Sequence, residues 1–131
     1  GKPIVMASEM SFCEMLWSRY REVAEQHGRN VPRGEEAAWG GYLVLADTKS
    51  EAEAWAEDCL WMWDSWSVPF GQDRPPLLIG DADTVSRMIE NAARHVPFRE
   101  VFLLFGQGIL ERDRCLKTLE LFAEKVIPRF R

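Results

Sequence analysis

The sequence predicts an α/β fold: a three-stranded parallel sheet with helices on one face. Three observations predict it. Short apolar runs without polar alternation are typical of strands buried on both sides. Amphipathic stretches with helical spacing lie between these runs, and glycine and proline clusters separate the segments. Because strands and helices alternate along 131 residues that are 47% hydrophobic, we expect a single domain over residues 1–131.

The first half of the chain supplies two of the expected strands and one long helix. Residues 3–7 form an apolar run of strand length, and residues 9–27 carry apolar side chains at three- and four-residue spacing. Gly28 ends that helix. After a turn-rich stretch, residues 39–46 form a second apolar run, which predicts the second strand.

The second half begins with a capping box. Thr48 stands three residues before Glu51, so its hydroxyl can accept from the Glu51 amide and start a helix. This helix continues into an aromatic stretch, and prolines then impose a loop before Asp81 caps a helix over residues 82–95. A third strand is expected over residues 100–105. The last helix is expected over residues 111–126, with its end marked by Pro128.

These strands present apolar side chains to both sides, so a sheet with helices on one face leaves the other face uncovered. Exposing five or six such side chains costs about 2 kcal/mol each, on the order of 10 kcal/mol in total. We therefore expect that face to be covered by association with another chain. The alternative is that the segment from Trp61 to Pro76 folds over the sheet.

Composition excludes several classes of partner and site. A net charge of -5 argues against a nucleic-acid partner, and no apolar run approaches the length of a membrane span. Three cysteines are far apart and match no metal-ligand spacing, so no metal is expected and the thiols are expected to be buried and reduced, as in the cytoplasm. No nucleophile, acid or base stands in a credible arrangement, so we name no catalytic residue.

Four segments carry a resemblance to a known family: residues 43–54, 78–85, 101–108 and 119–130, the last with the sequence LELFAEKVIPRF. Together they resemble the C-terminal part of the luciferase-like, flavin-dependent monooxygenases, which fold as (β/α)8 TIM barrels. The resemblance implies a partial barrel, about its last three βα units from the sixth strand to the eighth helix. Residues 61–77 then match a lid-like, aromatic and proline-rich insertion.

The resemblance also implies a chemistry. The family uses reduced FMN or the deazaflavin F420, and its FMN members oxygenate a small organic substrate. Because the first five βα units are absent from 131 residues, we expect the chain to be inactive alone. It would pair with an N-terminal partner half of the barrel or form a homodimer. The alternative is a non-catalytic binding or assembly subunit on the same scaffold, and a small self-sufficient α/β enzyme is a third option.

Candidate pocket residues follow from the barrel rule that active sites lie at the carboxyl ends of strands. Met6, Ser8, Phe105 and Gln107 stand there, although packing or turn roles are alternatives for them. Trp61, Trp63 and Trp66 are candidates for a lid that excludes water, or for core or interface. We expect Asp47, His27 and His95 to act as helix-terminal groups rather than in catalysis.

Overall fold

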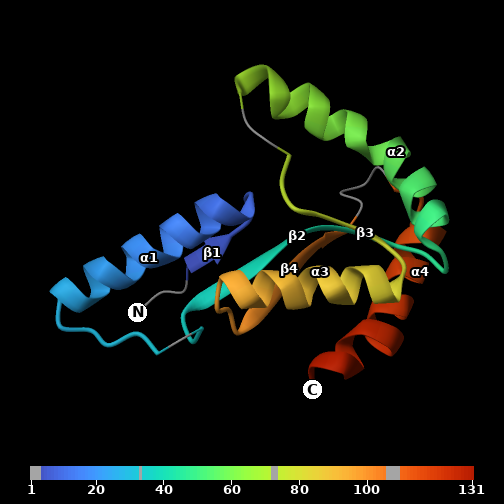
Figure 1. Ribbon diagram of the computed structural model, residues 1–131. Coiled ribbons are helices and arrows are strands. Elements are labelled where there is room, and N and C mark those ends of the chain that lie inside the picture. Colours follow the sequence, from blue (N-terminus) through green and yellow to red (C-terminus); the bar gives the residue numbers. More distant parts are fainter. Residues whose placement is uncertain (1–3, 33, 72–73, 106–109) are drawn as a thin grey trace.

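A computed structural model of the chain describes residues 4–32, 34–71, 74–105 and 110–131. It shows an all-parallel sheet with helices between its strands (Figure 1). The first half contains β1 (Ile4–Met6), α1 (Met10–Gln26), β2 (Ala37–Leu45) and α2 (Lys49–Trp66). These positions confirm the expected strands and helices of this half to within a few residues.

The second half adds two strands, two helices and shorter turns. Its elements, in chain order, are the 3-10 turn η1 (Val68–Phe70), β3 (Leu77–Gly80), α3 (Ala82–His95), β4 (Glu100–Phe105), α4 (Arg112–Leu121), the π-helical turn η2 (Phe122–Val126) and the 3-10 turn η3 (Ile127–Phe130). The predicted bounds of α3 and β4 are confirmed to the residue. The last helix stops being α-helical at Leu121 and not at Val126.

The sheet is arranged around β2, its longest described strand. Along one edge, β2 pairs first with β1 (Met6 opposite Trp39) and further on with β3 (Leu45 opposite Gly80). Its other edge pairs with β4. The expected sheet of three strands is therefore wrong, since the described residues form four.

The missed strand is β3. Its four residues follow Pro75 and Pro76, which predict a loop up to Asp81. A strand this short shows no periodicity of its own. It forms because Pro76 and Gly80 accept hydrogen bonds from Tyr42 and Ala46 at the two ends of its pairing with β2.

The expectation of helices on one face is also wrong. Figure 1 shows α2 and α3 on opposite sides of the sheet. Parallel crossovers are right-handed, so the side on which a helix packs depends on the direction of travel across the sheet. The chain moves one way from β2 to β3 and the opposite way from β3 to β4, which places α3 on the face opposite α2.

Two hydrophobic clusters correspond to these two faces. The α3 face of the sheet carries Trp39, Leu43 and Leu45, which pack with buried residues of α1 and α3. The α2 face carries Tyr42, Val44 and Ala46, which pack with small residues of α2, namely Ala52, Ala56 and Cys59. Strand alternation sends successive side chains of β2 to opposite clusters, and all nine residues of β2 are buried.

The expected uncovered face is therefore largely closed. Tyr42 and Val44 are fully buried under α2, and the Trp63 ring meets the Tyr42 ring edge-on at 5.9 Å between centroids. Burial raises the pKa of the Tyr42 phenol well above its ordinary value. The outer strand β4 is different, because its residues are exposed or only half-buried.

The centre of the sheet depends on Gly40 and Gly41. A Cβ at Gly40 would lie 1.7 Å from the Phe102 carbonyl oxygen, and one at Gly41 would lie 2.1 Å from the Pro76 carbonyl oxygen. Both obstacles are backbone atoms that cannot swing aside. The two glycines thus let neighbouring chain segments approach β2 closely.

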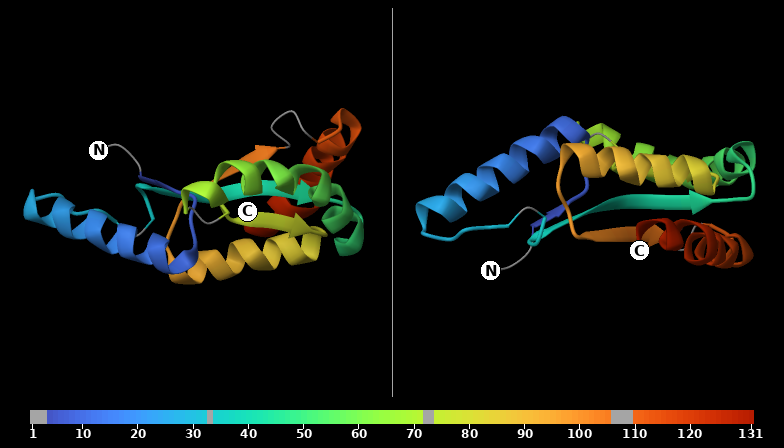
Figure 2. Two further views of the ribbon diagram at one scale, coloured as in Figure 1. Left: turned by 90° about the horizontal axis from the view of Figure 1, so that it is seen from above. Right: turned by 60° about the horizontal axis from the view of Figure 1, so that its bottom comes forward.

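Helix α4 closes the edge of β2 beyond the end of β4. Both views of Figure 2 place α4 beside the carboxyl end of β2. Thr118 Oγ1 accepts a hydrogen bond from Leu45 N at 3.2 Å and donates to Leu45 O at 2.9 Å. The buried hydroxyl therefore satisfies the last backbone groups of β2 that no strand reaches.

The described residues include no helix long and apolar enough to cross a membrane. Cys13, Cys59 and Cys115 are free thiols, as expected. Cys13 and Cys59 are buried and Cys115 is half-buried, so the expected burial is confirmed for two of the three.

Candidate functional site

The change of face between α2 and α3 defines a crevice at the carboxyl ends of β2 and β3. In open α/β sheets, loops that leave neighbouring strands toward opposite faces diverge and leave a binding crevice between them. A cavity of about 210 Å³ lies at this place. It is lined by Ala46, Asp47, Asp81, Ala82, Asp83, Leu121, Lys125 and Arg129.

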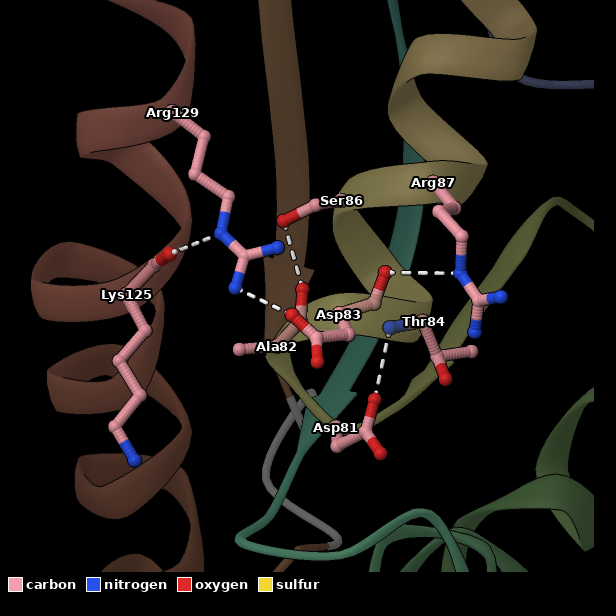
Figure 3. Close-up of polar contacts among 8 residues, drawn as sticks. All are labelled: Asp81, Ala82, Asp83, Thr84, Ser86, Arg87, Lys125 and Arg129. Carbon is pink, nitrogen blue, oxygen red and sulfur yellow. Dashed lines mark hydrogen bonds and ion pairs between the residues drawn. The ribbon is translucent and has the colours of Figure 1, made fainter.

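Asp81 lines one wall of the crevice, directly after Gly80 at the end of β3. Asp81 caps α3, where its Oδ1 accepts from the Thr84 amide at 2.8 Å (Figure 3). This hydrogen bond lowers the pKa of the Asp81 carboxyl below its ordinary value, so it is ionised at neutral pH. A Cβ at Gly80 would lie 2.8 Å from Thr84 Cγ2, so glycine allows α3 to begin directly after β3.

The opposite wall comes from the C-terminal segment, which comprises α4, η2 and η3 and ends at Arg131. Figure 3 shows Arg129 reaching from this segment to the Asp83 carboxylate, while its Nε donates to the Lys125 carbonyl at 3.0 Å. Lys125 Nζ lies 3.8 Å from Asp47 Oδ1, and Lys117 Nζ lies 3.1 Å from Asp47 Oδ2. Each cation of the crevice thus already has a carboxylate partner.

Asp47 behaves differently from the expectation of a helix-start residue. Thr48 is the N-cap of α2, and its hydroxyl accepts from the Glu51 amide at 3.2 Å, which confirms the hydroxyl half of the predicted capping box. Asp47 instead pairs with lysines of the C-terminal segment. It therefore links the end of β2 to that segment.

The two histidines lie at helix ends, as expected. His27 is the C-cap residue of α1. His95 is the last residue of α3, and its Nδ1 lies 2.9 Å from Glu14 Oε1 of α1. Neither histidine lines the crevice.

The candidates at strand ends are not brought together. Met6 pairs with Trp39, six residues before the end of β2, or about 20 Å along the strand. Met6 is buried in the α3-face core, while the Ser8 carbonyl faces the Cys13 thiol at 3.4 Å. Phe105 packs half-buried against the same core, and Gln107 falls outside the described residues.

The tryptophan candidates belong to the end of α2 and not to a loop. Trp63 is buried on the α2 face, whereas Trp61 and Trp66 are 58% and 65% exposed. Trp66 stacks on Trp63 at 6.5 Å between ring centroids. Since α2 starts at the carboxyl end of β2 and spans 18 residues, these rings lie roughly 18 to 26 Å along the helix from its start. A lid role for them stays a prediction.

The residues that do line the crevice include three that sequence reasoning did not single out: Leu121, Lys125 and Arg129. Their spacing of four residues places them on one helical face, which is a signal the sequence contains. The sequence does not reveal strand β3, and the end of this strand is what places the crevice opposite that helical face. Among described residues, no group of three or more metal-ligating side chains is present.

Comparison with known proteins shows a similarity of fold but none of sequence. No protein-family model matches the sequence, and no curated protein sequence matches it. Solved structures of monooxygenases, one of them in complex with FMN, do match its fold. The chain is thus similar in fold to part of such enzymes. Its sequence identity to them is too low to show membership of a family.

Two structures illustrate the match. One is the monooxygenase RslO1 from Streptomyces bottropensis, at 18% identity and a TM-score of 0.67, covering 98% of this chain and 42% of that one. The other is a type II Baeyer-Villiger monooxygenase, the oxygenating constituent of 3,6-diketocamphane monooxygenase from the CAM plasmid of Pseudomonas putida, in complex with FMN. It matches at 17% identity and a TM-score of 0.75, over 95% of this chain and 41% of that chain. The chain therefore spans less than half the length of either structure.

The crevice does not fit the phosphate of FMN. A phosphate needs free amides or unpaired cations, as at an uncapped helix start. Here Thr48 and Asp81 side chains occupy the starts of α2 and α3, and Lys125 and Arg129 are paired with Asp47 and Asp83. The carboxylates would repel a phosphate dianion, so the described residues of the crevice offer it no cradle.

Proposed function

We propose that this chain is the carboxyl-terminal portion of a luciferase-like, flavin-dependent monooxygenase acting on a small organic substrate. The observation that carries the proposal is the match of 95% of the chain to 41% of an FMN-containing monooxygenase, at a TM-score of 0.75. Its flavin would be FMN, or F420 in the deazaflavin branch of the family. The remaining strands would come from an N-terminal portion of the barrel.

On this proposal the chain alone neither binds flavin nor catalyses a reaction. Its crevice has no unpaired cation for a phosphate, and no described residue there forms a nucleophile or an acid and base pair. Oxygen chemistry would be supplied by the reduced flavin. The chain's own contribution would be wall and positioning, with Asp47, Lys125 and Arg129 holding the C-terminal segment against the strand ends.

The position of α2 favours a second candidate, a non-catalytic binding or assembly subunit on the same scaffold. In a barrel the helices form the outer ring, so all of them pack on one side of the strands. Here α1 and α3 cover one face and α2 covers the other. Joining a barrel would require α2 to leave Tyr42 and Val44, whereas a subunit that never joins one keeps α2 in place.

The two candidates are separated by flavin titration of two proteins. The first is the 131-residue chain, and the second is the product of the native gene, with its mass determined by immunoblot. The proposal expects a longer native product that binds FMN or F420 at one per chain and a 131-residue chain that does not. A native product of about 15 kDa without flavin would overturn it in favour of the binding subunit. Stoichiometric flavin with turnover in the 131-residue chain would overturn the expected inactivity.

Hydrogen exchange of α2 adds an independent measurement. If the chain is part of a barrel, amides of α2 near Ala56 and Cys59 lose protection in the longer product relative to the 131-residue chain, because α2 must leave the sheet. Unchanged protection in a flavin-binding product would show that the barrel forms with α2 in place. The predicted displacement of α2 would then be wrong.

A further inference from the structure

A second cavity lies away from the crevice, over the α3 face of β4. Its volume is about 470 Å³, within the range of small-molecule sites. Its walls come from α3, from β4 with the residues before it, and from the C-terminal segment. They are formed by Ile89, Ala93, Phe98, Arg99, Val101, Phe122, Ile127, Phe130 and Arg131. We name this cavity the β4 groove and propose that it binds an amphiphilic anion, an alkyl chain that ends in a carboxylate.

The floor of the β4 groove is apolar and open. Val101 and Phe130 are 36% and 46% exposed, although both side chains are large and hydrophobic. The wall at Phe98 is held in place, because its ring stacks on the buried Trp39 ring at 5.5 Å between centroids. Such a surface favours an alkyl chain, and each methylene buried there tightens binding by up to about fourfold.

The charged side chains that line the β4 groove are both cationic. Arg99 and Arg131 are among its lining residues, and no aspartate or glutamate side chain is. In the described part of the chain, neither guanidinium has an ion pair or side-chain hydrogen bond, in a protein whose net charge is -5. Unpaired guanidinium groups beside an apolar floor match a carboxylate, which they can hold with two parallel hydrogen bonds.

The contrast with the crevice supports this assignment. At the strand ends, Arg129 and Lys125 are paired with Asp83 and Asp47, so those cations are committed to the fold. In the β4 groove the arginines are left available. Val101 pairs with Trp39 in the first half of β2, whereas the crevice lies beyond Leu45. The β4 groove is thus a separate place, and the inference does not depend on the proposed flavin chemistry.

Binding of decanoate to the 131-residue chain tests the proposal. The probe is cis-parinarate, a fluorescent polyunsaturated fatty acid, displaced by decanoate, by decanol or by decyltrimethylammonium at equal concentrations. Decanoate is expected to displace it at the lowest concentration, and octanoate to bind up to about sixteenfold more weakly because it buries two fewer methylenes. Equal potency of decanol and decanoate would overturn the anionic head, and failure of all three to displace bound probe would overturn the alkyl site.

Matched arginine variants locate the site. Arg99→Gln is expected to weaken decanoate about tenfold and to leave decanol unchanged, because it removes a charged hydrogen bond to the carboxylate. Arg112→Gln is the control, since Arg112 is exposed on α4 and does not line the β4 groove. Both substitutions are on the surface, so both variants should fold. If Arg99→Gln and Arg112→Gln bind decanoate equally, the β4 groove is not the site.

A second copy of the chain is the competing occupant. Light scattering at the concentrations used for binding distinguishes it. A monomer that binds decanoate supports the proposal. A dimer that excludes the probe, and that Phe130→Asp converts to monomer, would overturn it by showing that the β4 groove is an interface.

Discussion

Strands β2 and β4 have similar apolar sequences but very different surroundings. Every residue of β2 is buried, whereas β4 is exposed or half-buried along its whole length. β2 has α2 above one face, α1 and α3 on the other and a paired strand along each edge. β4 pairs only with β2 among the described residues, and the β4 groove opens on its α3 face.

The difference shows that an apolar run predicts a strand but not how well that strand is covered. Which face of a strand is covered by a helix depends on the direction in which each connection crosses the sheet. The position of β3, which the sequence does not predict, sets that direction. By reversing the direction of travel, β3 sends α2 to the face that would otherwise be open. The apolar surface that remains exposed therefore lies on β4 and not on β2. We expect partners or ligands to bind there.

The largest effect is expected where β2 meets β4. Gly40→Ala places a Cβ 1.7 Å from the Phe102 carbonyl oxygen, so the two strands must separate. We expect a loss of at least about 4 kcal/mol in the free energy of unfolding, enough to unfold a domain of this size. Urea unfolding followed by circular dichroism measures it.

Gly28→Ala is the control for this substitution. A Cβ at Gly28 meets nothing within 4 Å, although its φ of +71° disfavours alanine. Gly28→Ala should lower the free energy of unfolding by about 1 kcal/mol. Equal losses at Gly28 and Gly40 would show that backbone conformation, and not the contact of β2 with β4, limits stability.

The next effect compares matched leucines on the α3 face of the two strands. Leu43 of β2 is fully buried, and Leu103 of β4 is half-buried against the same cluster. Leu43→Ala is expected to cost about 3 to 5 kcal/mol, and Leu103→Ala about half as much, because less surface returns to water and less cavity remains. Losses of equal size would show that a partner covers β4 in solution, and light scattering would then detect it.

The sequence predicts the structure most accurately where local chemistry decides it. The caps at Thr48 and Asp81 and the bounds of α3 and β4 follow from side chains close together in the chain. Strand β3 is not predicted, because its four residues become a strand only where β2 offers an unpaired edge. That edge is a tertiary fact that no local pattern contains.

The candidate site shows the same limit. The barrel rule directs attention to strand ends, but Met6 lies about 20 Å from the end of β2 because β1 pairs with its beginning. Lys125 and Arg129 have a helical spacing that the sequence shows. Their partners Asp47 and Asp83 become recognisable only once α4 is placed beside the end of β2.

A smaller effect is expected at the end of β2 that β4 does not reach. Thr118→Val keeps the shape of the buried side chain but leaves Leu45 N and O without a partner on that edge. We expect a loss of about 1 to 3 kcal/mol. Thr118→Ser retains the hydroxyl and should cost less, apart from the small cavity of one methyl group. If Ser and Val are equally destabilising, packing and not the hydrogen bonds holds α4 in place.

The smallest effect is expected from the charge of Asp81 at the end of β3, measured as the pH dependence of the free energy of unfolding. The pKa of Asp81 is lowered in the folded chain, chiefly by the Thr84 amide, so its ionised form stabilises the fold above its unfolded pKa of about 3.9. That contribution is lost as the pH falls through the lower folded pKa. Asp81→Asn keeps a side-chain oxygen for the cap but does not titrate. We therefore expect the variant to differ little from the parent near pH 7, and to lose less stability than the parent between about pH 5 and pH 2 in urea titrations at each pH. Parallel pH profiles would show that the stability of this edge rests on the packing around β2 alone.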